Sequence, residues 1–201
     1  MKKKLLASLA LGVAACGAIF GLASCGNNDS KNNNTSTTVV DEGGEEDLGF
    51  TEVTIFEGVQ KEFLNLNAVY FQPVDMTGGY KATDYDCHLE LDVSALKNDF
   101  GYGTGDWVPY LTVEYLVKKG DKTVAQGTFM PMAASDGPHY GQNIKLDGDG
   151  TYSVTFTIKF PDTSSVYLIH TDNTGPEKST FPNTITYTYD SWNFKNGAWN
   201  N

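Results

Sequence analysis

The chain of 201 residues contains no arginine, only three histidines and only three cysteines. Because contacts to phosphate depend on basic side chains, the lack of arginine argues against nucleic-acid binding and disfavours phosphorylated ligands. All 25 acidic residues but only 11 of the 14 lysines lie beyond residue 24, so that part of the chain has a formal charge of −14. A field of this sign attracts cations.

The scarcity of cysteine excludes an internal disulfide. The N-terminus has a Lys-rich start, an apolar run over 5–22 and then Leu22-Ala23-Ser24-Cys25, which is typical of a lipoprotein signal cleaved before a lipidated Cys25. The alternatives are a plain secretory signal and a membrane-spanning helix. Cys16 is removed with the signal and Cys25 carries the lipid, which leaves Cys87 without a partner. We therefore expect a lipid-anchored protein on the outer side of the cytoplasmic membrane, or in the periplasm.

Four segments follow from composition. Residues 1–24 are the expected signal, and 25–49 are the lipidated cysteine with a polar, acidic tether that has almost nothing to bury. Residues 50–192 are long enough for one domain with one core. We expect 193–201, an Asn-rich end, to be a frayed tail.

Long stretches with helical periodicity are also missing from the domain. Apolar residues instead alternate with polar ones over 111–118, 152–160 and 184–189, and turn signals rich in glycine and aspartate lie between the alternating runs. Further strands are expected at 52–56, 64–72, 86–93 and 123–132. Seven or eight short antiparallel strands predict an all-β, immunoglobulin-like sandwich.

Each of the three histidines lies near another type of metal ligand, so we interpret them as parts of one metal site. In an extended strand His88, Glu90 and Asp92 share one face, whereas Cys87 joins the apolar residues on the other face. Cys87 is therefore expected in the core, His88 and Glu90 at an ion, and Asp92 at the rim of the site. Imidazole suits late first-row metals.

The other two histidines come from separate segments. Met130 and Met132 share a face of the strand expected at 123–132, and a turn over 133–138 brings His139 back towards the sulfur of Met132. His170 is followed two residues later by Asp172, which could orient its imidazole. The simpler alternative for each residue alone is an ordinary core or surface position.

Several motifs together resemble the periplasmic ferrous-iron-transport protein family, which includes the pathogen-specific membrane antigen of treponemes. The resemblance spans nearly the whole domain. It is carried by 68–76, His88-Leu89-Glu90, 105–113, 127–132, 134–141 and His170-Thr171-Asp172.

The resemblance implies a homodimeric sandwich with metal sites near the dimer interface. The family's ligands correspond to His88, Glu90, Met132, His139 and His170. Accessory acidic or thioether positions correspond to Glu52, Met76, Asp92 and Asp136. The implied metals are Fe²⁺ or Cu²⁺, with Zn²⁺ or Mn²⁺ possible in the same site, and the implied partner is an iron permease in the membrane.

We expect a binding protein rather than an enzyme, because no Ser/His/Asp or Cys/His nucleophile arrangement is evident. Acid is expected to weaken binding, since a protonated imidazole cannot ligate a metal. A copper-loaded protein that helps to oxidise ferrous iron is one alternative. Another is a structural or adhesive lipoprotein in which Trp192, Trp199, Tyr187 and Tyr189 bind a partner.

Overall fold

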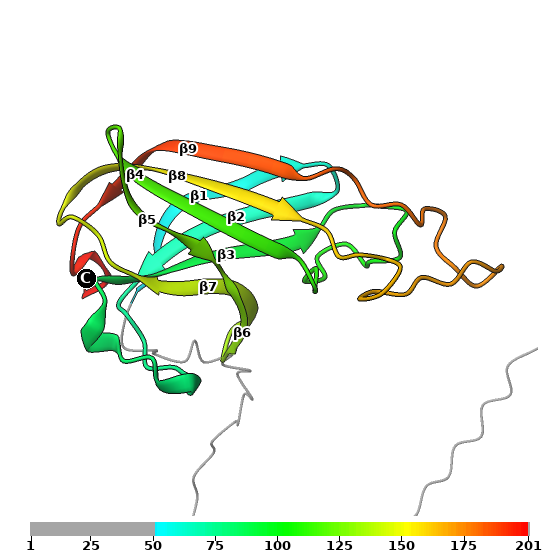
Figure 1. Ribbon diagram of the computed structural model, residues 1–201, viewed down its shortest axis with the longest axis horizontal. Coiled ribbons are helices and arrows are strands. Elements are labelled where there is room, and N and C mark those ends of the chain that lie inside the picture. The colour runs from blue at the N-terminus through cyan, green and yellow to red at the C-terminus, as the bar shows by residue number, and fades with distance from the viewer. Residues whose placement is uncertain (1–50, 201) are drawn as a thin grey trace, which may run out of the picture. The chain divides into compact units, whose positions relative to one another are not determined.

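The computed structural model describes residues 51–200, and the expected signal, Cys25 and tether lie outside them. Nine antiparallel strands and three short 3₁₀ turns make up this part of the chain (Figure 1). The strands are β1 (Val53–Lys61), β2 (Leu64–Phe71), β3 (Cys87–Ala95), β4 (Thr112–Lys119), β5 (Lys122–Thr128), β6 (Met130–Ala134), β7 (Gly137–Ile144), β8 (Gly150–Lys159) and β9 (Ile185–Phe194). The 3₁₀ turns are η1 (Thr77–Gly79), η2 (Ala82–Asp84) and η3 (Ala198–Asn200). Within residues 51–200, no helix is long and apolar enough to cross a membrane.

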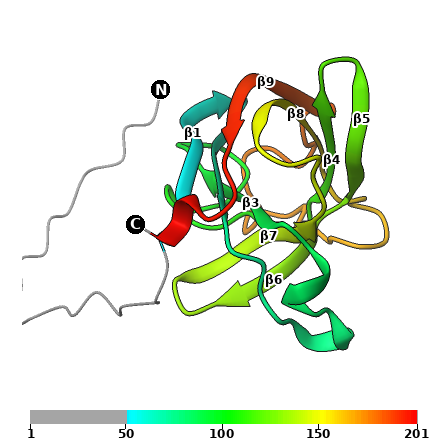
Figure 2. The same ribbon diagram turned by 90° about the vertical axis from the view of Figure 1, so that its left-hand side faces the viewer.

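The strands form two layers, and the view along the strands in Figure 2 shows them facing each other. One sheet has the order β1-β2-β3-β7-β6 and the other β5-β4-β8-β9. The period-2 patterns place their apolar residues between the sheets, as Val113 on β4, Val154 on β8 and Leu91 on β3 show by their complete burial. The predicted all-β sandwich is confirmed.

The strand expected at 123–132 is two strands in different sheets. Its first part, β5, pairs with β4, and its second part, β6, pairs with β7. The change of sheet occurs at Phe129, which is buried and donates its backbone N–H to Val113 O at 2.8 Å. Periodicity did not show this break because both parts are extended.

The segment 137–144 was expected to begin as a turn and is the strand β7. Ser135-Asp136 forms the tight connection from β6, and the chain then returns alongside both β6 and β3. β7 therefore places His139 directly opposite Met132. The predicted approach of these two residues is correct, but a strand pair produces it.

The C-terminal end is packed, so the expected frayed tail is wrong. β9 continues to Phe194, and Trp199 is buried, with its carbonyl accepting the Thr51 N–H at 2.9 Å. Trp192 is also buried, and Tyr187 packs on the core beside Phe56. The four aromatic residues expected to bind a partner in that alternative, including Tyr189, therefore lie in the core or pack against it.

Candidate metal centre

The candidate centre lies on the outer face of the five-stranded sheet, opposite the sandwich core. On β3, Cys87 and Leu89 point into the core, whereas His88 and Glu90 point outward. The expected division of β3 into two faces is thus confirmed, and Cys87 is a buried free thiol. Burial raises the pKa of this thiol well above its ordinary value, which makes it a poor ligand.

Strand register brings the ligand types from three strands together. β7 runs between β3 and β6, with Glu90 opposite Gly141 on one side and His139 opposite Met132 on the other. Residues opposite each other in a ladder share a face of the sheet, so these side chains project to the same side. This places two imidazoles, a carboxylate and a thioether over a single patch of three strands.

Three of the expected ligands form a tight, buried group. One ligand atom from each of His88, Glu90 and His139 lies within 4.8 Å of the others, and all three side chains are buried. The distance from His139 Nδ1 to Glu90 Oε1 is 3.3 Å. Because they come from strands, their positions are fixed by the ladder rather than by a loop.

The segment 72–86 covers this face and makes it a pocket. It contains η1 and η2 and lies below the strands at the lower left of Figure 1. The pocket has a volume of about 730 Å³ and is bordered by this segment, by β6 and by the strands beneath. Its lining includes the expected residues His88, Glu90, Met132, His139, Glu52, Met76 and Asp136. Coverage by this segment explains why both faces of β3 are buried.

Not every expected residue reaches the pocket. Asp92 shares a side-chain hydrogen bond with Glu90 but does not line the cavity, which agrees with its predicted position at the rim. His170 is exposed on the long connection between β8 and β9, which extends away from the strands at the right of Figure 1. Within one chain, His170 belongs to neither the buried group nor the pocket lining.

Asp172, which was expected to orient the imidazole of His170, is connected to it through Thr174. The Thr174 hydroxyl donates to Asp172 Oδ1 at 2.6 Å, and the distance from His170 Nδ1 to Thr174 Oγ1 is 2.9 Å. Since the hydroxyl proton is directed to Asp172, Thr174 Oγ1 accepts the proton of His170 Nδ1. Asp172 therefore acts on His170 through Thr174.

Negative charge is concentrated at the pocket. Its lining holds Glu52, Asp75, Glu90 and Asp136 but no lysine. Burial, followed by the charges of Asp92, Glu52 and Asp136, raises the pKa of Glu90 to about 9. Burial and the charges of Asp136 and Asp92 likewise raise the pKa of Glu52. A cation entering the pocket would relieve this repulsion.

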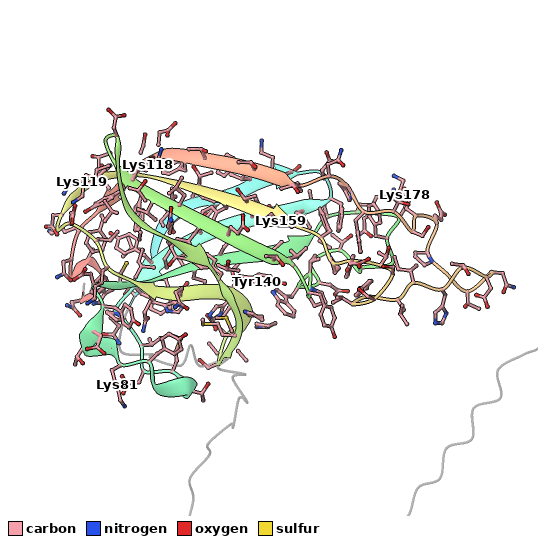
Figure 3. All side chains as sticks on the ribbon, in the orientation of Figure 1. Lys81, Lys118, Lys119, Tyr140, Lys159 and Lys178 are labelled. Atoms are coloured by element: carbon pink, nitrogen blue, oxygen red, sulfur yellow. The ribbon has the colours of Figure 1, made fainter. Side chains whose placement is uncertain are left out.

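The lysines lie elsewhere or are already paired. Figure 3 shows Lys81 on the segment 72–86, Lys119 at the upper left and Lys178 on the long connection. Lys81 pairs with Asp75 at 3.5 Å, Lys119 donates to the carbonyls of Asp147 and Asp149, and Lys178 pairs with Asp99. None of the ion pairs within residues 51–200 joins a lysine to Glu90.

The two buried histidines are neutral at physiological pH. Burial lowers the pKa of His88 to about 4 and also lowers the pKa of His139. With Glu90 protonated, its contact with His139 joins neutral groups rather than an ion pair. Both imidazoles thus keep a lone pair for a metal at neutral pH. A proton at Glu90 therefore competes with a metal near neutral pH, in addition to the competition expected at the imidazoles in acid.

The residues fit a late transition metal. Two imidazoles and a carboxylate, with a thioether beside them, match the donors that such ions prefer. The backbone also leaves room, since a Cβ at Gly141 would lie 2.6 Å from His88 Nε2. Sequence reasoning missed Gly141 and the neighbouring Asn143. Their alternation with Tyr140, Gln142 and Ile144 is the strand signal that could have revealed both.

Comparison with known proteins decides the family. The family model described as Fe²⁺ transport protein matches residues 49–196. The chain belongs to this family. The resemblance noted from the sequence is therefore confirmed, and membership supports a metal-binding role in iron transport.

Individual relatives agree with this assignment. The 34 kDa membrane antigen of Treponema pallidum is 39% identical over 160 residues, which cover 75% of this chain and 78% of the relative. Among solved structures, FetP of uropathogenic Escherichia coli is 42% identical with a TM-score of 0.63, covering 73% of this chain and 100% of that one. The copper-reconstituted P19 protein of Campylobacter jejuni is 36% identical with a TM-score of 0.61, covering 70% and 96%.

Proposed function

We propose that this family member is an extracytoplasmic metal-binding lipoprotein that captures iron, or copper, and supports ferrous-iron uptake through a membrane permease. The observation that carries the proposal is the buried group of His88, Glu90 and His139 within 4.8 Å. Removing these polar side chains from water is costly even though they contact one another, and a bound cation would offset part of that cost. Capture and release, rather than chemistry on a substrate, suit such a site.

The proposed location rests on the lipobox and on two relatives. Leu22-Ala23-Ser24-Cys25 supplies the expected anchor. The Treponema pallidum relative is a membrane antigen, and FetP was expressed in the periplasm for its structure. A lipid at Cys25 would hold the metal pocket near a permease in the same membrane. The acidic tether over 25–49 would set its reach.

Fe²⁺ and copper are the metals we favour, and Zn²⁺ and Mn²⁺ can use the same donors. Imidazole nitrogen binds all of these late metals, and the Met132 thioether adds a soft donor that favours copper. The copper-reconstituted state of the Campylobacter jejuni neighbour is consistent with that choice. Glu90 and the surrounding carboxylates add hard oxygen donors suited to Fe²⁺.

We further propose that a homodimer completes the site, with His170 of one copy reaching the pocket of the other. His170 lies outside its own pocket, and two neighbours on its loop are exposed apolar residues, Val166 at 63% and Leu168 at 78%. The pocket rim formed by β6 includes Met130, which is 53% exposed. Association of these surfaces would bury apolar area and supply a third imidazole. In sedimentation experiments, Leu168→Asp should then shift the protein towards monomer and weaken metal binding.

Anaerobic titration of the protein without its first 25 residues tests the proposal. Fe²⁺, Cu²⁺, Mn²⁺ and Zn²⁺ are each titrated into wild type and into His139→Ala. Binding of one ion per chain by wild type, lost in the variant by elemental analysis, is the expected result. Equal metal content in the two proteins would remove His139 from the site.

Assisted oxidation of ferrous iron is the second candidate, because Met132 beside two imidazoles suits copper. His88, His139 and Met132 would hold the copper, which would supply a one-electron acceptor for Fe²⁺ with dioxygen as the terminal oxidant. The aerobic rate of Fe²⁺ loss with copper-loaded protein is compared with that of the same concentration of free copper. A rate no higher than that of free copper eliminates this candidate.

A further inference from the structure

His88 and Asn143 face each other across β3 and β7. They are opposite one another in the ladder, and the distance from His88 Nδ1 to Asn143 Oδ1 is 2.9 Å. His88 is 1% exposed and Asn143 is 2% exposed, so water does not compete for this contact. Which of the two groups donates depends on the tautomer of the imidazole and on the orientation of the amide.

The orientation of the Asn143 amide is fixed by the backbone of Val74. Asn143 Nδ2 donates to Val74 O at 2.7 Å, and Asn143 Oδ1 accepts the Val74 N–H at 3.2 Å. Turning the amide over would place its NH₂ group against an N–H and its oxygen against a carbonyl. Val74 can satisfy only the observed orientation, so the atom that faces His88 is an oxygen.

An amide oxygen carries no proton, so His88 Nδ1 must supply the proton of this hydrogen bond. In a neutral imidazole the other nitrogen, Nε2, then keeps the lone pair. We propose that Asn143 is a positioning residue that holds His88 in the Nδ1–H tautomer and thereby selects Nε2 as its metal-binding atom. This inference rests on the proposed function, because it takes His88 to be a ligand.

The surroundings of Nε2 agree with this role. A Cβ built on Gly141 would lie 2.6 Å from Nε2, so the glycine leaves this nitrogen unobstructed. Asn143 and Gly141 are two residues apart on β7 and project to the same side as His88. One fixes the proton of the ring and the other leaves space beside its lone pair.

Asn143 also joins the imidazole to the cover of the pocket. Val74 lies in the segment 72–86 and itself lines the pocket, as do Asp75 and Met76. The two hydrogen bonds from Asn143 therefore hold this segment against the sheet at the position of His88. Loss of the Asn143 side chain would let His88 adopt either tautomer. It would also remove the two hydrogen bonds that hold the segment 72–86 to β7 at Val74.

The tautomer can be read directly in the metal-free protein by ¹⁵N NMR of the imidazoles. With only three histidines, His139→Ala and His170→Ala identify the His88 signals. In wild type at neutral pH, His88 Nδ1 should have the shift of a protonated, pyrrole-like nitrogen and Nε2 that of an unprotonated, pyridine-like nitrogen. The reverse pattern in wild type overturns the proposal without recourse to any variant.

Two substitutions separate positioning from a purely structural role. Asn143→Leu removes the acceptor, so His88 should populate both tautomers and metal affinity should fall by about 10- to 100-fold. Asn143→Asp keeps an oxygen opposite Nδ1 and should preserve the wild-type tautomer, although it loses the bond to Val74 O. Asn193→Leu on β9, whose amide bonds Thr151, is the matched control and should change neither the tautomer nor affinity.

The outcomes also distinguish this inference from the proposed function. A wild-type tautomer in Asn143→Leu overturns the role of Asn143, whatever the metal data show. If the tautomers are as expected but wild type fails to bind Fe²⁺ or Cu²⁺, the hydrogen-bond assignment stands. The proposed metal site is then refuted. If Asn143→Leu fails to fold, the wild-type spectrum and that of Asn143→Asp decide.

Discussion

Two regions that carry histidine use the same local device in opposite settings. On β3, His88 is buried, and its Nδ1 is held by Asn143. On the connection between β8 and β9, His170 is exposed, and its Nδ1 is held by Thr174. Both arrangements leave Nε2 available for a ligand. The difference is that strand register brings His88 to other metal donors, whereas among residues 51–200 of the same chain His170 joins no such group.

This difference divides the proposed ligand set into a preformed part and a part added by assembly. His88, Glu90 and His139 are placed by ladders that must form for the domain to fold, so their geometry exists before a metal arrives. His170 contributes only if a second copy supplies a pocket. A site divided in this way would bind metal most tightly in the dimer, and separation of the copies would favour release.

Replacement of the histidines tests this division with the largest expected effect. His88→Ala should lower metal affinity by at least about 100-fold at any protein concentration, because it removes a preformed donor. His170→Ala should lower affinity only at concentrations where the dimer forms. Competition with a chromogenic chelator over a range of protein concentrations measures both. Equal, concentration-independent losses in the two variants would mean that no such division exists.

Glu90→Gln tests the charge of the preformed part. The folded pKa of Glu90, about 9, is above its ordinary value of 4.5, so Glu90 is neutral in the folded metal-free protein at pH 7 but charged when unfolded. Its favourable contribution to stability is complete below its unfolded pKa and is lost as pH rises towards 9. Glutamine removes this loss, and the free energy of unfolding at pH 7 should rise by about 3 kcal/mol. Urea unfolding at pH 5, 7 and 8 measures it.

The same substitution should change how metal binding depends on pH. In wild type, a metal must displace the Glu90 proton, so affinity should rise by about tenfold per pH unit between pH 6 and 8. Glu90→Gln should bind about tenfold or more weakly at pH 8 and lose most of this slope. Glu114→Gln, at an exposed ion pair with Lys159 on the other sheet, is the control. A wild-type slope retained in Glu90→Gln would show that another group carries the proton.

The sequence predicted the preformed region well because the alternation of polar and apolar residues shows which face of a strand each side chain occupies. The alternation around His88 correctly separated Cys87 from Glu90, since a strand has only two faces. It did not locate the change of sheet at Phe129, because an extended chain has the same pattern in either sheet. Nor did it identify Asn143, whose importance comes from pairing with residues more than 50 positions away in the chain.

The loop region was less predictable because local neighbours do not determine its contacts. Proximity in sequence suggested Asp172 as the residue that orients His170, but it did not show that Thr174 lies between them. The prediction of a frayed C-terminal tail was wrong for a related reason. A polar, Asn-rich composition predicts exposure, but Trp199 is buried against the sandwich. Its carbonyl accepts the N–H of Thr51, which lies near the start of the domain in the sequence.

Gly141→Ala is a smaller perturbation of the preformed part. The added methyl group would lie 2.6 Å from His88 Nε2, so the imidazole must move, and metal affinity should fall by about tenfold. The control is Gly127→Ala on β5, where a Cβ meets only the Tyr115 ring, at 3.1 Å or more. Titration and thermal unfolding of both variants separate the effects. Unchanged affinity in Gly141→Ala would show that Nε2 does not face the metal.

Thr174→Val tests the loop with the smallest expected effect. Valine keeps the shape of threonine but removes the hydroxyl that connects His170 Nδ1 to Asp172, so the ring can rotate and change tautomer. We expect metal affinity in the dimer to fall by about fivefold. This is less than the roughly 10- to 100-fold loss expected when the hydrogen-bond partner of a buried ligand is removed, because His170 is exposed. Thr171→Val on the same loop is the control. A loss of affinity that persists in dilute, monomeric protein would mean that this loop acts on the metal site of its own chain. That result would contradict the contrast between the two regions.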